Sequence, residues 1–461
     1  MTDPSLLPAE EMVQLFARRI IDPVEMLQAV TARVARLNPG INAFAAMHRD
    51  ALVQAGDSAA RWRAGRPIGP LDGVPVTVKD LIDVAGMPTR RGSRTTPSTP
   101  AADDAPIVTS LRAAGAVIIG KTTTTEFGWK SPGDCPLHGI TRNPWNTDHT
   151  PGGSSSGAAA ACAAGFGPLH VGTDAGGSIR IPAAWCGVVG LKPSFGRVPQ
   201  WPLGAFGNVA VAGPMTRTVR DAALMLGVIG RHDLRDPFCL PDDPRDWLDG
   251  IEQGVAGLRI AVLRRPGFDA PVDWEGIAAI EQAARHLMEA GAEVEDVDID
   301  LPDVREIFSR IWAMALSRQV AATSEANRAM LDPGLLQVAA ATGGIKALDM
   351  MEAEAMRVQA AHSMARLHQR YDLVLSPCVP NPAPRVDQPI GDPVEALWTR
   401  WAPWTFAWNL TRQPAISVPM GFTEQGLPRS VQLAAGLYRD ELVLRAARSL
   451  ELACPVPIAD L

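Results

Sequence analysis

Apolar residues recur with two different spacings in the first part of the chain. From Pro8 to Ile20 and from Pro23 to Leu37 they return every three or four residues. This spacing predicts two amphipathic helices, and Asn38-Pro39-Gly40 is expected to end the second. From Pro70 to Asp80 the pattern becomes a turn followed by a β-branched run that ends at Lys79. That change predicts a short strand.

Helical and strand patterns alternate through much of the remaining chain. A helix over 107–114 leads through Gly115 into a strand at 116–119. The other predicted segments are strands at 258–263, 293–299, 372–377 and 415–419, and helices at 274–290, 302–370 and 442–454. Such alternation is typical of proteins in which strands are joined through helices and pair in parallel. The chain is therefore predicted to be an α/β protein with much of its sheet parallel.

Residues 139–213 interrupt this alternation with a stretch rich in glycine and serine. It contains Pro151-Gly-Gly-Ser-Ser-Ser-Gly157, an alanine run at 158–164, and Val171-Gly-Thr-Asp-Ala-Gly-Gly-Ser178. Low-complexity sequence of this kind often forms flexible linkers. Here the glycines alternate with alanines, valines and Trp185. We therefore expect a buried segment, in which glycine lets the backbone approach its neighbours closely.

Composition and charge narrow the classes of function. The chain has 461 residues, 46% of them hydrophobic, and a formal net charge of -7. This charge gives no electrostatic footprint for nucleic acid. The short basic cluster of Arg90, Arg91 and Arg94 is interpreted as a solvated loop. Six cysteines are scattered without a CxxC pair, so neither a disulfide framework nor a metal site is predicted.

The N-terminus carries acidic residues and lacks the basic-then-apolar pattern of a signal peptide. The most apolar runs are short or are broken by glycine and proline, so no membrane span is predicted. We therefore expect a cytoplasmic protein, and no cofactor is expected.

Two familiar motifs fit the glycine-rich stretch poorly. The run Gly153-Ser-Ser-Ser-Gly157 matches the G-x-S-x-G of α/β-hydrolases, but that motif needs a preceding strand, and 143–151 has the composition of a loop. A glycine-rich turn at a helix start can bind phosphate. The run 172–177, however, lacks the lysine and the serine or threonine of a P-loop.

A third interpretation pairs a serine with Lys79. A serine hydroxyl needs a base to act as a nucleophile. A lysine can be that base only when it is neutral, and burial favours the neutral form. Lys79 ends an apolar strand, where an ammonium group would lose its water. The alternative for Lys79 is a salt bridge to Asp80 or Asp83, and the residue pattern alone leaves both open.

Three blocks, in this order, resemble the amidase signature family. They are Gly73-Val-Pro-Val-Thr-Val-Lys79-Asp80, Thr150-Pro-Gly-Gly-Ser-Ser-Ser-Gly157 and Gly172-Thr-Asp-Ala-Gly-Gly-Ser178-Ile-Arg180. The match continues through 187–198 and 409–419, covers nearly the whole chain and is weakest over 235–370. It departs at Ser156, where relatives often carry glycine; this alters the turn slightly and leaves the implied catalytic residues in place.

The resemblance implies a single large α/β domain over residues 1–461. Its central sheet is expected to be mixed, mostly parallel and twisted, with helices covering both faces. Residues 70–220 are expected to form the core that carries the catalytic residues. Residues 235–370 are expected to form a helical, more variable outer layer of the same domain.

The resemblance also implies an amidase that cleaves a C–N bond through an acyl-enzyme. It places the nucleophile on Ser178, a bridging serine behind a cis peptide bond on Ser154, and the base on Lys79. The backbone N–H groups implied for the oxyanion hole are those of Ala175, Gly176, Gly177 and Ser178. The residues implied to support this machinery are Ser155, Thr173, Asp174 and Arg180, the last two as a pair.

The resemblance sets the reaction and leaves the substrate open. Apolar and aromatic residues are expected to wall the substrate pocket: Phe127, Trp129, Leu137, Leu203, Phe206, Trp401 and Trp404. No arginine or lysine outside structural roles is evidently placed to bind a substrate carboxylate. We therefore predict a small-molecule amide substrate, an aryl or alkyl amide or anilide, with esters and carbamates as further candidates.

Two other functions share this sequence pattern. The glutaminase component of a tRNA-dependent amidotransferase carries the same blocks, although a tryptophan-rich late region argues against a glutamine pocket. A catalytically inactive binding protein of the same fold is disfavoured because Lys79, Ser154 and Ser178 are all present. A homodimer is expected only from the family resemblance.

Overall fold

One sheet of eleven strands runs through the computed structural model, which describes residues 3–457 and 459 except 267, 269, 300, 342–344, 389 and 390. In spatial order its strands are β1 (Phe44–Met47), β3 (Val117–Thr122), β2 (Pro75–Lys79), β6 (Leu169–Asp174), β8 (Val211–Thr216), β7 (Val189–Lys192), β12 (Ala415–Phe422), β13 (Pro428–Ala435), β11 (Leu373–Pro377), β9 (Arg259–Val262) and β10 (Glu293–Asp296). A separate hairpin consists of β4 (Asp134–Cys135) and β5 (Gly139–Ile140).

The sheet is mixed, as predicted, but parallel pairing has a smaller share than predicted. Parallel pairs join β3, β2 and β6 at one end and β11, β9 and β10 at the other. Between these groups β6, β8, β7, β12, β13 and β11 pair antiparallel, as β1 does with β3. The sequence pattern missed β13, which follows β12 after the short connection 423–427. A connection that short joins only antiparallel neighbours.

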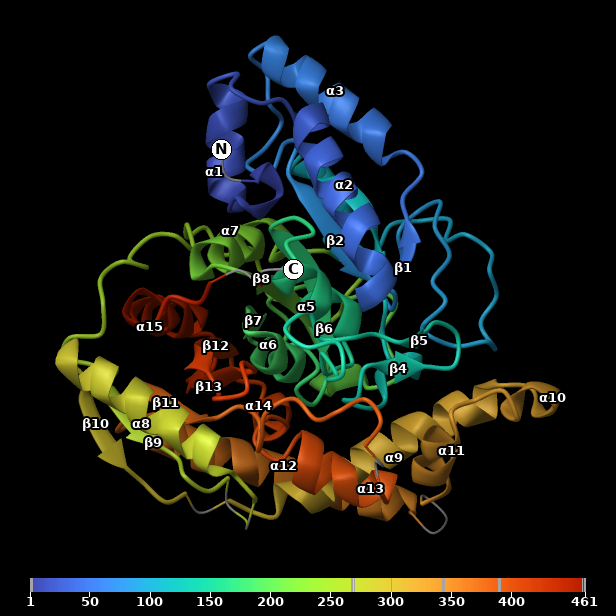
Figure 1. Ribbon diagram of the computed structural model, residues 1–461. Helices are drawn as coiled ribbons and strands as arrows, with labels where there is room; N and C mark the ends of the chain where they lie inside the picture. Colours follow the sequence, from blue (N-terminus) through green and yellow to red (C-terminus); the bar gives the residue numbers. More distant parts are fainter. Residues whose placement is uncertain are drawn as a thin grey trace.

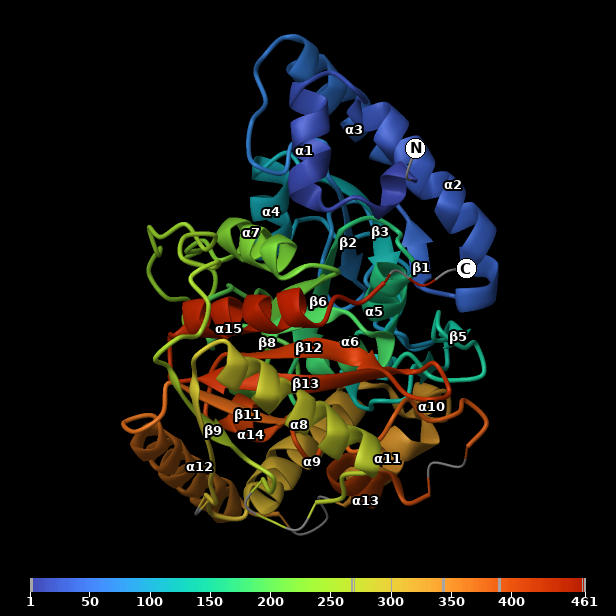
Figure 2. The same ribbon diagram turned by 60° about the vertical axis from the view of Figure 1, so that its left-hand side comes forward.

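Helices cover both faces of the sheet. Successive residues of a strand point to opposite faces, so one strand contributes side chains to the cores on both sides. Ile118 of β3 packs in one hydrophobic core, whereas Val117 and Ile119 pack in another. The helices that contribute to the first core include α1 (Ala9–Ala17), α4 (Pro106–Ala113), α7 (Val219–Ile229), α8 (Trp274–Glu289) and α15 (Asp440–Ala453). In Figure 2, α15 runs alongside β12, and the two elements are in contact.

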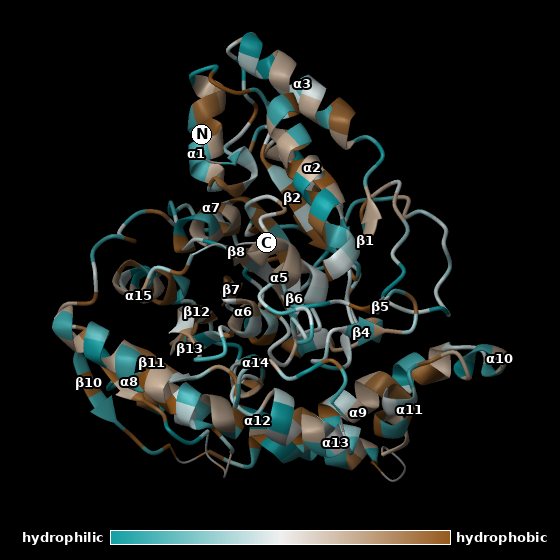
Figure 3. Cartoon of the chain, viewed as in Figure 1, coloured by the Kyte–Doolittle hydropathy of each residue, from teal (hydrophilic) through white to brown (hydrophobic). Residues whose placement is uncertain are grey.

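The remaining helices belong mainly to the cores of the opposite face. They are α2 (Pro23–Ile41), α3 (Ala51–Arg63), α5 (Ser156–Ala163), α6 (Arg180–Cys186), α9 (Val304–Ala322), α11 (Pro333–Ala340), α12 (Ala347–Leu367), α13 (Pro393–Ala396) and α14 (Ala407–Leu410). The short α10 (Glu325–Arg328) lies between α9 and α11. Figure 1 shows α1–α3 at one end of the molecule and α9, α11 and α12 at the other. The outer helices α8 and α12 each contain both hydrophilic and hydrophobic residues (Figure 3).

The helical segment predicted at 302–370 is present as separate helices, from α9 to α12, and its residues 342–344 lie outside the described part. The second predicted helix is longer than expected. It continues through Pro39 to Ile41 and ends at Asn42, which has the left-handed φ of 58°. The left-handed Asn42 therefore ends this helix, and Asn38-Pro39-Gly40 lies inside it.

The glycine-rich segment is buried, as predicted, and glycine is required in it. Trp185 is fully buried, and so is α5. At Gly157 a Cβ atom would collide with the carbonyl oxygen of Ala43 and the backbone nitrogen of Thr123. The start of α5 can therefore lie directly against the main chain beside β1 and β3.

Candidate active site

Lys79 lies at the end of β2 and points away from the first core. Val76 and Val78 of the same strand pack in that core, so Thr77 and Lys79 face the side on which α5 packs. The Lys79 side chain is completely buried. This position results from the two-residue period of the strand, and it brings the amine beside the serines that precede α5.

The Lys79 amine is surrounded by hydroxyl groups. Its Nζ lies 2.8 Å from Ser154 Oγ, 2.9 Å from Ser155 Oγ and 2.9 Å from Thr173 Oγ1. Burial holds the pKa of Lys79 well below the ordinary lysine value, and the negative charge of Asp174 only partly opposes this shift. A neutral amine keeps a lone pair that can accept a proton. The predicted alternative, a salt bridge from Lys79 to Asp80 or Asp83, is not found among the described residues, and Asp80 pairs instead with Lys121 at 2.8 Å.

The two serines beside Lys79 have different surroundings. Ser155 Oγ donates to the carbonyl oxygen of Thr173 at 3.1 Å and accepts the Thr173 N–H at 3.2 Å. Ser154 Oγ has Lys79 as its partner within the described residues and lines a cavity, and the peptide bond between Gly153 and Ser154 is cis, as the resemblance implies. Ser154 is therefore the serine that can connect the amine to a group in the cavity.

Ser178 lies in the turn between β6 and α6 and lines the same cavity as Ser154. Its carbonyl oxygen accepts the N–H of Ser155 at 3.1 Å, which ties the two serine-bearing segments together. Among the hydrogen bonds of the described residues, none uses the N–H groups of Ala175, Gly176 or Ser178. These donors are therefore available to an oxyanion.

Gly177, the fourth predicted oxyanion donor, is already engaged. Its N–H donates to Asp174 Oδ1 at 2.7 Å. Its φ of 129° lies in the region that favours glycine, and a Cβ atom there would collide with Thr405 Oγ1. Thr405 Oγ1 in turn donates to the carbonyl oxygen of Gly176 at 2.5 Å. Gly177 thus shapes the turn, and its N–H is held away from an oxyanion role by the carboxylate.

Asp174 and Arg180 form the predicted pair beneath this turn. Arg180 Nε and one terminal nitrogen donate to the two Asp174 oxygens, each at 3.0 Å, and both side chains are fully buried. Burial by itself would raise the pKa of Asp174, but the Arg180 charge and hydrogen bonds bring it down to about 2. The carboxylate therefore stays ionised and fixes the backbone that carries Ser178.

The cavity is walled mainly by apolar side chains from several separate segments of the chain. Three of the predicted wall residues, Phe127, Leu203 and Phe206, line it. Further walls come from the segment after β2 and from the loop before β8, including Ile82 and the half-exposed Trp201. A mainly apolar cavity that also holds serine hydroxyl groups and N–H donors suits a small substrate with a polar reacting group.

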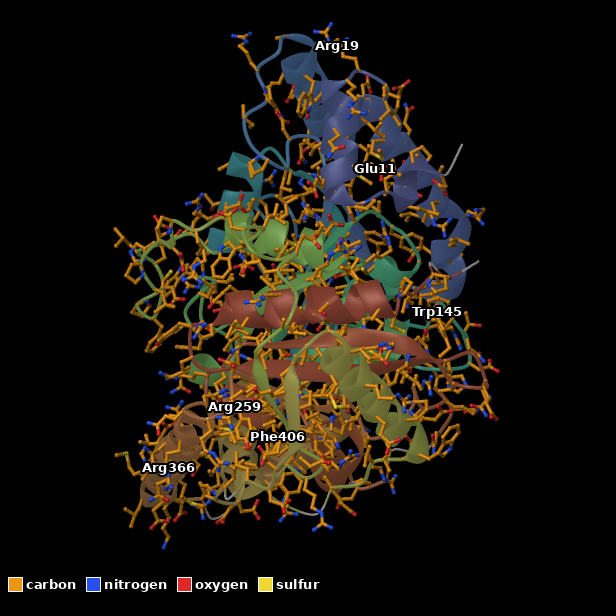
Figure 4. The ribbon with its side chains drawn as sticks, turned by 90° about the vertical axis from the view of Figure 1, so that its left-hand side faces the viewer. Glu11, Arg19, Trp145, Arg259, Arg366 and Phe406 are labelled. Carbon is orange, nitrogen blue, oxygen red and sulfur yellow. The ribbon has the colours of Figure 1, made fainter. Side chains whose placement is uncertain are left out.

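Four predicted wall residues lie outside this cavity. Trp129 is buried against Trp401, with ring centroids 6.3 Å apart. Trp404 donates its indole N–H to the carbonyl oxygen of Pro271 at 3.3 Å. Leu137 donates its backbone N–H to Gly92 at 3.3 Å. Trp129 and Trp401 belong to a hydrophobic core that also holds Phe406, labelled in Figure 4. Apolar character alone does not separate a core residue from a cavity wall.

Several cavity residues were not predicted as wall residues. Besides Ile82 and Trp201 they include Asp83, Arg91 and Gln319. Arg91 belongs to the basic cluster that was interpreted as a solvated loop. Its place in the cavity wall was not expected from the sequence. The available signal was proximity in sequence to the Lys79 block, which a charge count does not use.

The chain belongs to the Amidase family: the sequence model of that family matches its residues 25–444. It is therefore an amide-hydrolysing enzyme, and the resemblance carried by the three sequence blocks is confirmed. An acylamidase of Rhodococcus erythropolis is 36% identical over 466 residues, covering 99% of this chain and 97% of the relative. The A-type component of the glutamyl-tRNA(Gln) amidotransferase of Symbiobacterium thermophilum is 34% identical over 475 residues, covering 96% of each chain.

Among solved structures, that of a bacterial aryl acylamidase of the amidase signature family is similar with a TM-score of 0.90. The two chains are 30% identical, and the match covers 98% of this chain and 96% of the other. Within the described residues there is no cluster of three or more His, Cys, Asp or Glu side chains suited to a metal ion. No helix of that part of the chain combines the length and apolar character needed to cross a membrane.

Proposed function

We propose that this enzyme cleaves amide bonds through an acyl-enzyme on Ser178, with Lys79 as the base and Ser154 as the proton relay. One observation carries the proposal: the buried amine of Lys79 lies 2.8 Å from Ser154, which lines the same cavity as Ser178. Burial that favours the neutral amine gives the base its lone pair.

The reaction begins when Ser178 gives its proton to Ser154 as Ser154 gives its own to Lys79. Ser178 Oγ attacks the substrate carbonyl, and the N–H groups of Ala175, Gly176 and Ser178 stabilise the oxyanion. One such donor is worth about 3 kcal/mol of barrier. The relay then reverses and protonates the leaving nitrogen as the C–N bond breaks. Water, deprotonated by the same relay, releases the acid and restores Ser178.

The proposed substrates are aryl or alkyl amides and anilides. Esters and carbamates of similar shape are further candidates. The apolar and aromatic walls formed by Phe127, Leu203 and Phe206 support this choice. The acylamidase and aryl acylamidase relatives support it as well.

Glutamine hydrolysis is the second candidate, because a component of a glutamyl-tRNA(Gln) amidotransferase is 34% identical to this chain. Glutamine is small and polar, and it would leave much of the apolar cavity wall without a contact. Ammonia release from glutamine, together with co-purification of partner proteins, would favour this candidate over an acylamidase.

Turnover of N-phenylbutanamide tests the proposal. Ser178→Ala and Lys79→Met should each lower kcat/KM by about a thousandfold or more, because members of one catalytic unit fail together. The exposed Ser98 offers a matched control, and Ser98→Ala should keep wild-type activity. The wild-type rate should also fall as the pH drops through the lowered pKa of Lys79. A flat acid limb, or an active Lys79→Met variant, contradicts the lysine-base assignment.

A further inference from the structure

We propose that Arg91 makes this site selective for amides that carry a carboxylate near the scissile bond. The inference rests on the proposed amide hydrolysis at Ser178 and names a chemical class within it. It reverses the expectation, based on sequence alone, of a purely apolar recognition site.

The position of the Arg91 side chain is the first argument. Arg91 lines the cavity together with Ser154 and Ser178, and it is half-buried. Among the described residues no hydrogen bond or ion pair involves its guanidinium group. Asp83 is the other charged residue among the described cavity walls, and no ion pair joins it to Arg91. A guanidinium presents five N–H donors in a fixed fork that matches a carboxylate.

The backbone at Arg91 is the second argument. Arg91 has a φ of 53°, and its neighbour in the cavity wall, Phe127, has a φ of 50°. The two residues are joined, because the N–H of Phe127 donates to the carbonyl oxygen of Arg91 at 2.9 Å. Non-glycine residues rarely adopt this conformation, and such strain concentrates at functional sites. Two adjacent examples in one cavity wall indicate that the direction of these side chains matters.

A buried ion pair fixes the segment that carries Arg91. Asp80, directly after Lys79, pairs with Lys121 at 2.8 Å, and both side chains are almost fully buried. Lys121 Nζ also donates to Pro88 O at 3.0 Å and to Thr89 Oγ1 at 2.7 Å. The carbonyl oxygen of Asp80 accepts the N–H of Arg91 at 3.1 Å. Arg91 is thus held in a fixed relation to the proposed base, and preorganisation of this kind strengthens binding.

The other two arginines of the cluster have different surroundings. Arg90 Nε donates to Thr96 O at 3.1 Å, and Arg94 is exposed and does not line the cavity. Arg94 is therefore a matched control for the loss of one positive charge from this loop. Asp83 adds one negative charge to the cavity wall, which disfavours a substrate with two carboxylates.

Binding to the Ser178→Ala variant tests the inference without turnover. Two pairs of probes, measured by calorimetry, differ by one carboxylate. N-phenylsuccinamate against N-phenylbutanamide places the charge on the acyl part, and 4-acetamidobenzoate against acetanilide places it on the amine part. In at least one pair the carboxylate should bind about ten- to a hundredfold more tightly. Addition of Arg91→Gln should remove that preference, and addition of Arg94→Gln should leave it intact.

Arg91→Lys keeps the charge without the fork and should retain part of the preference. Because each preference is a ratio within one variant, a partly unfolded sample changes both members equally. The inference is overturned if the two members of each pair bind equally, or if none of the probes binds measurably. It is also overturned if the preference for the carboxylate survives Arg91→Gln. Failure of the wild type to hydrolyse N-phenylbutanamide or its carboxylate counterpart counts instead against the proposed function.

Discussion

Ser154 and Ser155 lie at almost the same distance from Lys79, but their other contacts differ. Ser155 Oγ is occupied by the backbone of Thr173 on both its donor and acceptor sides. Ser154 lines the cavity that Ser178 also lines, and its Oγ has Lys79 as its hydrogen-bond partner within the described residues. The two serines therefore differ in their other hydrogen bonds and not in their distance to the Lys79 amine. This difference is the reason to propose Ser154, and not Ser155, as the proton relay.

This difference predicts opposite phenotypes for two alanine variants. Ser154→Ala should lower kcat/KM for N-phenylbutanamide by about 10²- to 10⁴-fold, the usual worth of proton transfer, with little change in stability. Ser155→Ala should lower the free energy of unfolding by about 1–3 kcal/mol, because it removes a hydrogen-bond partner from the Thr173 backbone and from the buried Lys79 amine. Steady-state kinetics and denaturant unfolding measure the two effects. A larger kinetic loss in Ser155→Ala would reverse the assignment of the relay.

The elements around Ser178 are joined through one side chain, Arg180 at the start of α6. Beyond Asp174, its terminal nitrogens donate to Thr405 O at 2.9 Å, to Gln432 Oε1 at 2.7 Å and to Asn409 Oδ1 at 2.7 Å. All five N–H donors are used, and the partners lie on β6, β13, α14 and the segment before it. The Asp174–Arg180 pair was implied by the sequence. Its partners were not, because they come from segments more than two hundred residues away.

Removal of Arg180 should therefore destabilise the protein as well as the turn. Arg180→Met leaves Asp174 buried without its counter-charge, a change that typically costs about 3–5 kcal/mol. Arg235, which pairs with Asp233 at the surface, gives the control, and Arg235→Met should cost about 1 kcal/mol or less. Urea unfolding of both variants measures the difference. Equal losses would mean that the buried network does not stabilise the fold.

Across the whole molecule, the sequence predicts elements better than their pairing. The strand ending at Lys79 and the helix at 274–290 agree with β2 and α8 to within a residue. The antiparallel centre of the sheet was not predicted, because strand pairing depends on turns and on contacts between distant segments. Arg91 was missed for a similar reason, since its φ and the cavity beside it arise only in the folded chain. The division into a 70–220 core and a 235–370 outer layer, the cytoplasmic location and the homodimer stay predictions.

The buried carboxyl of Asp221, which joins α7 to α1, should make the stability of the protein depend on pH. Asp221, in the first turn of α7, is buried and accepts the N–H of Ala9 at the start of α1 at 3.0 Å. Burial raises the pKa of Asp221 to about 7, against the opposing charge of Arg217. The folded state therefore holds a proton that the unfolded state loses near pH 4. The free energy of unfolding should consequently fall as the pH rises from about 4 to about 7.

Asp221→Asn keeps an oxygen acceptor for Ala9 and removes this titration. At pH 8 the variant should be more stable than the wild type by up to about 4 kcal/mol, the full linkage effect of the raised pKa. At pH 4 most of that advantage should disappear, because the wild-type carboxyl is then protonated and resembles the amide. Denaturant unfolding at the two pH values provides the measurement. Asp57→Asn, at an exposed position, serves as the control and should change stability by less than about 0.5 kcal/mol at either pH. If Asp221→Asn raised the free energy of unfolding by the same amount at pH 4 and pH 8, the Asp221 carboxyl would not have the raised pKa on which this prediction depends.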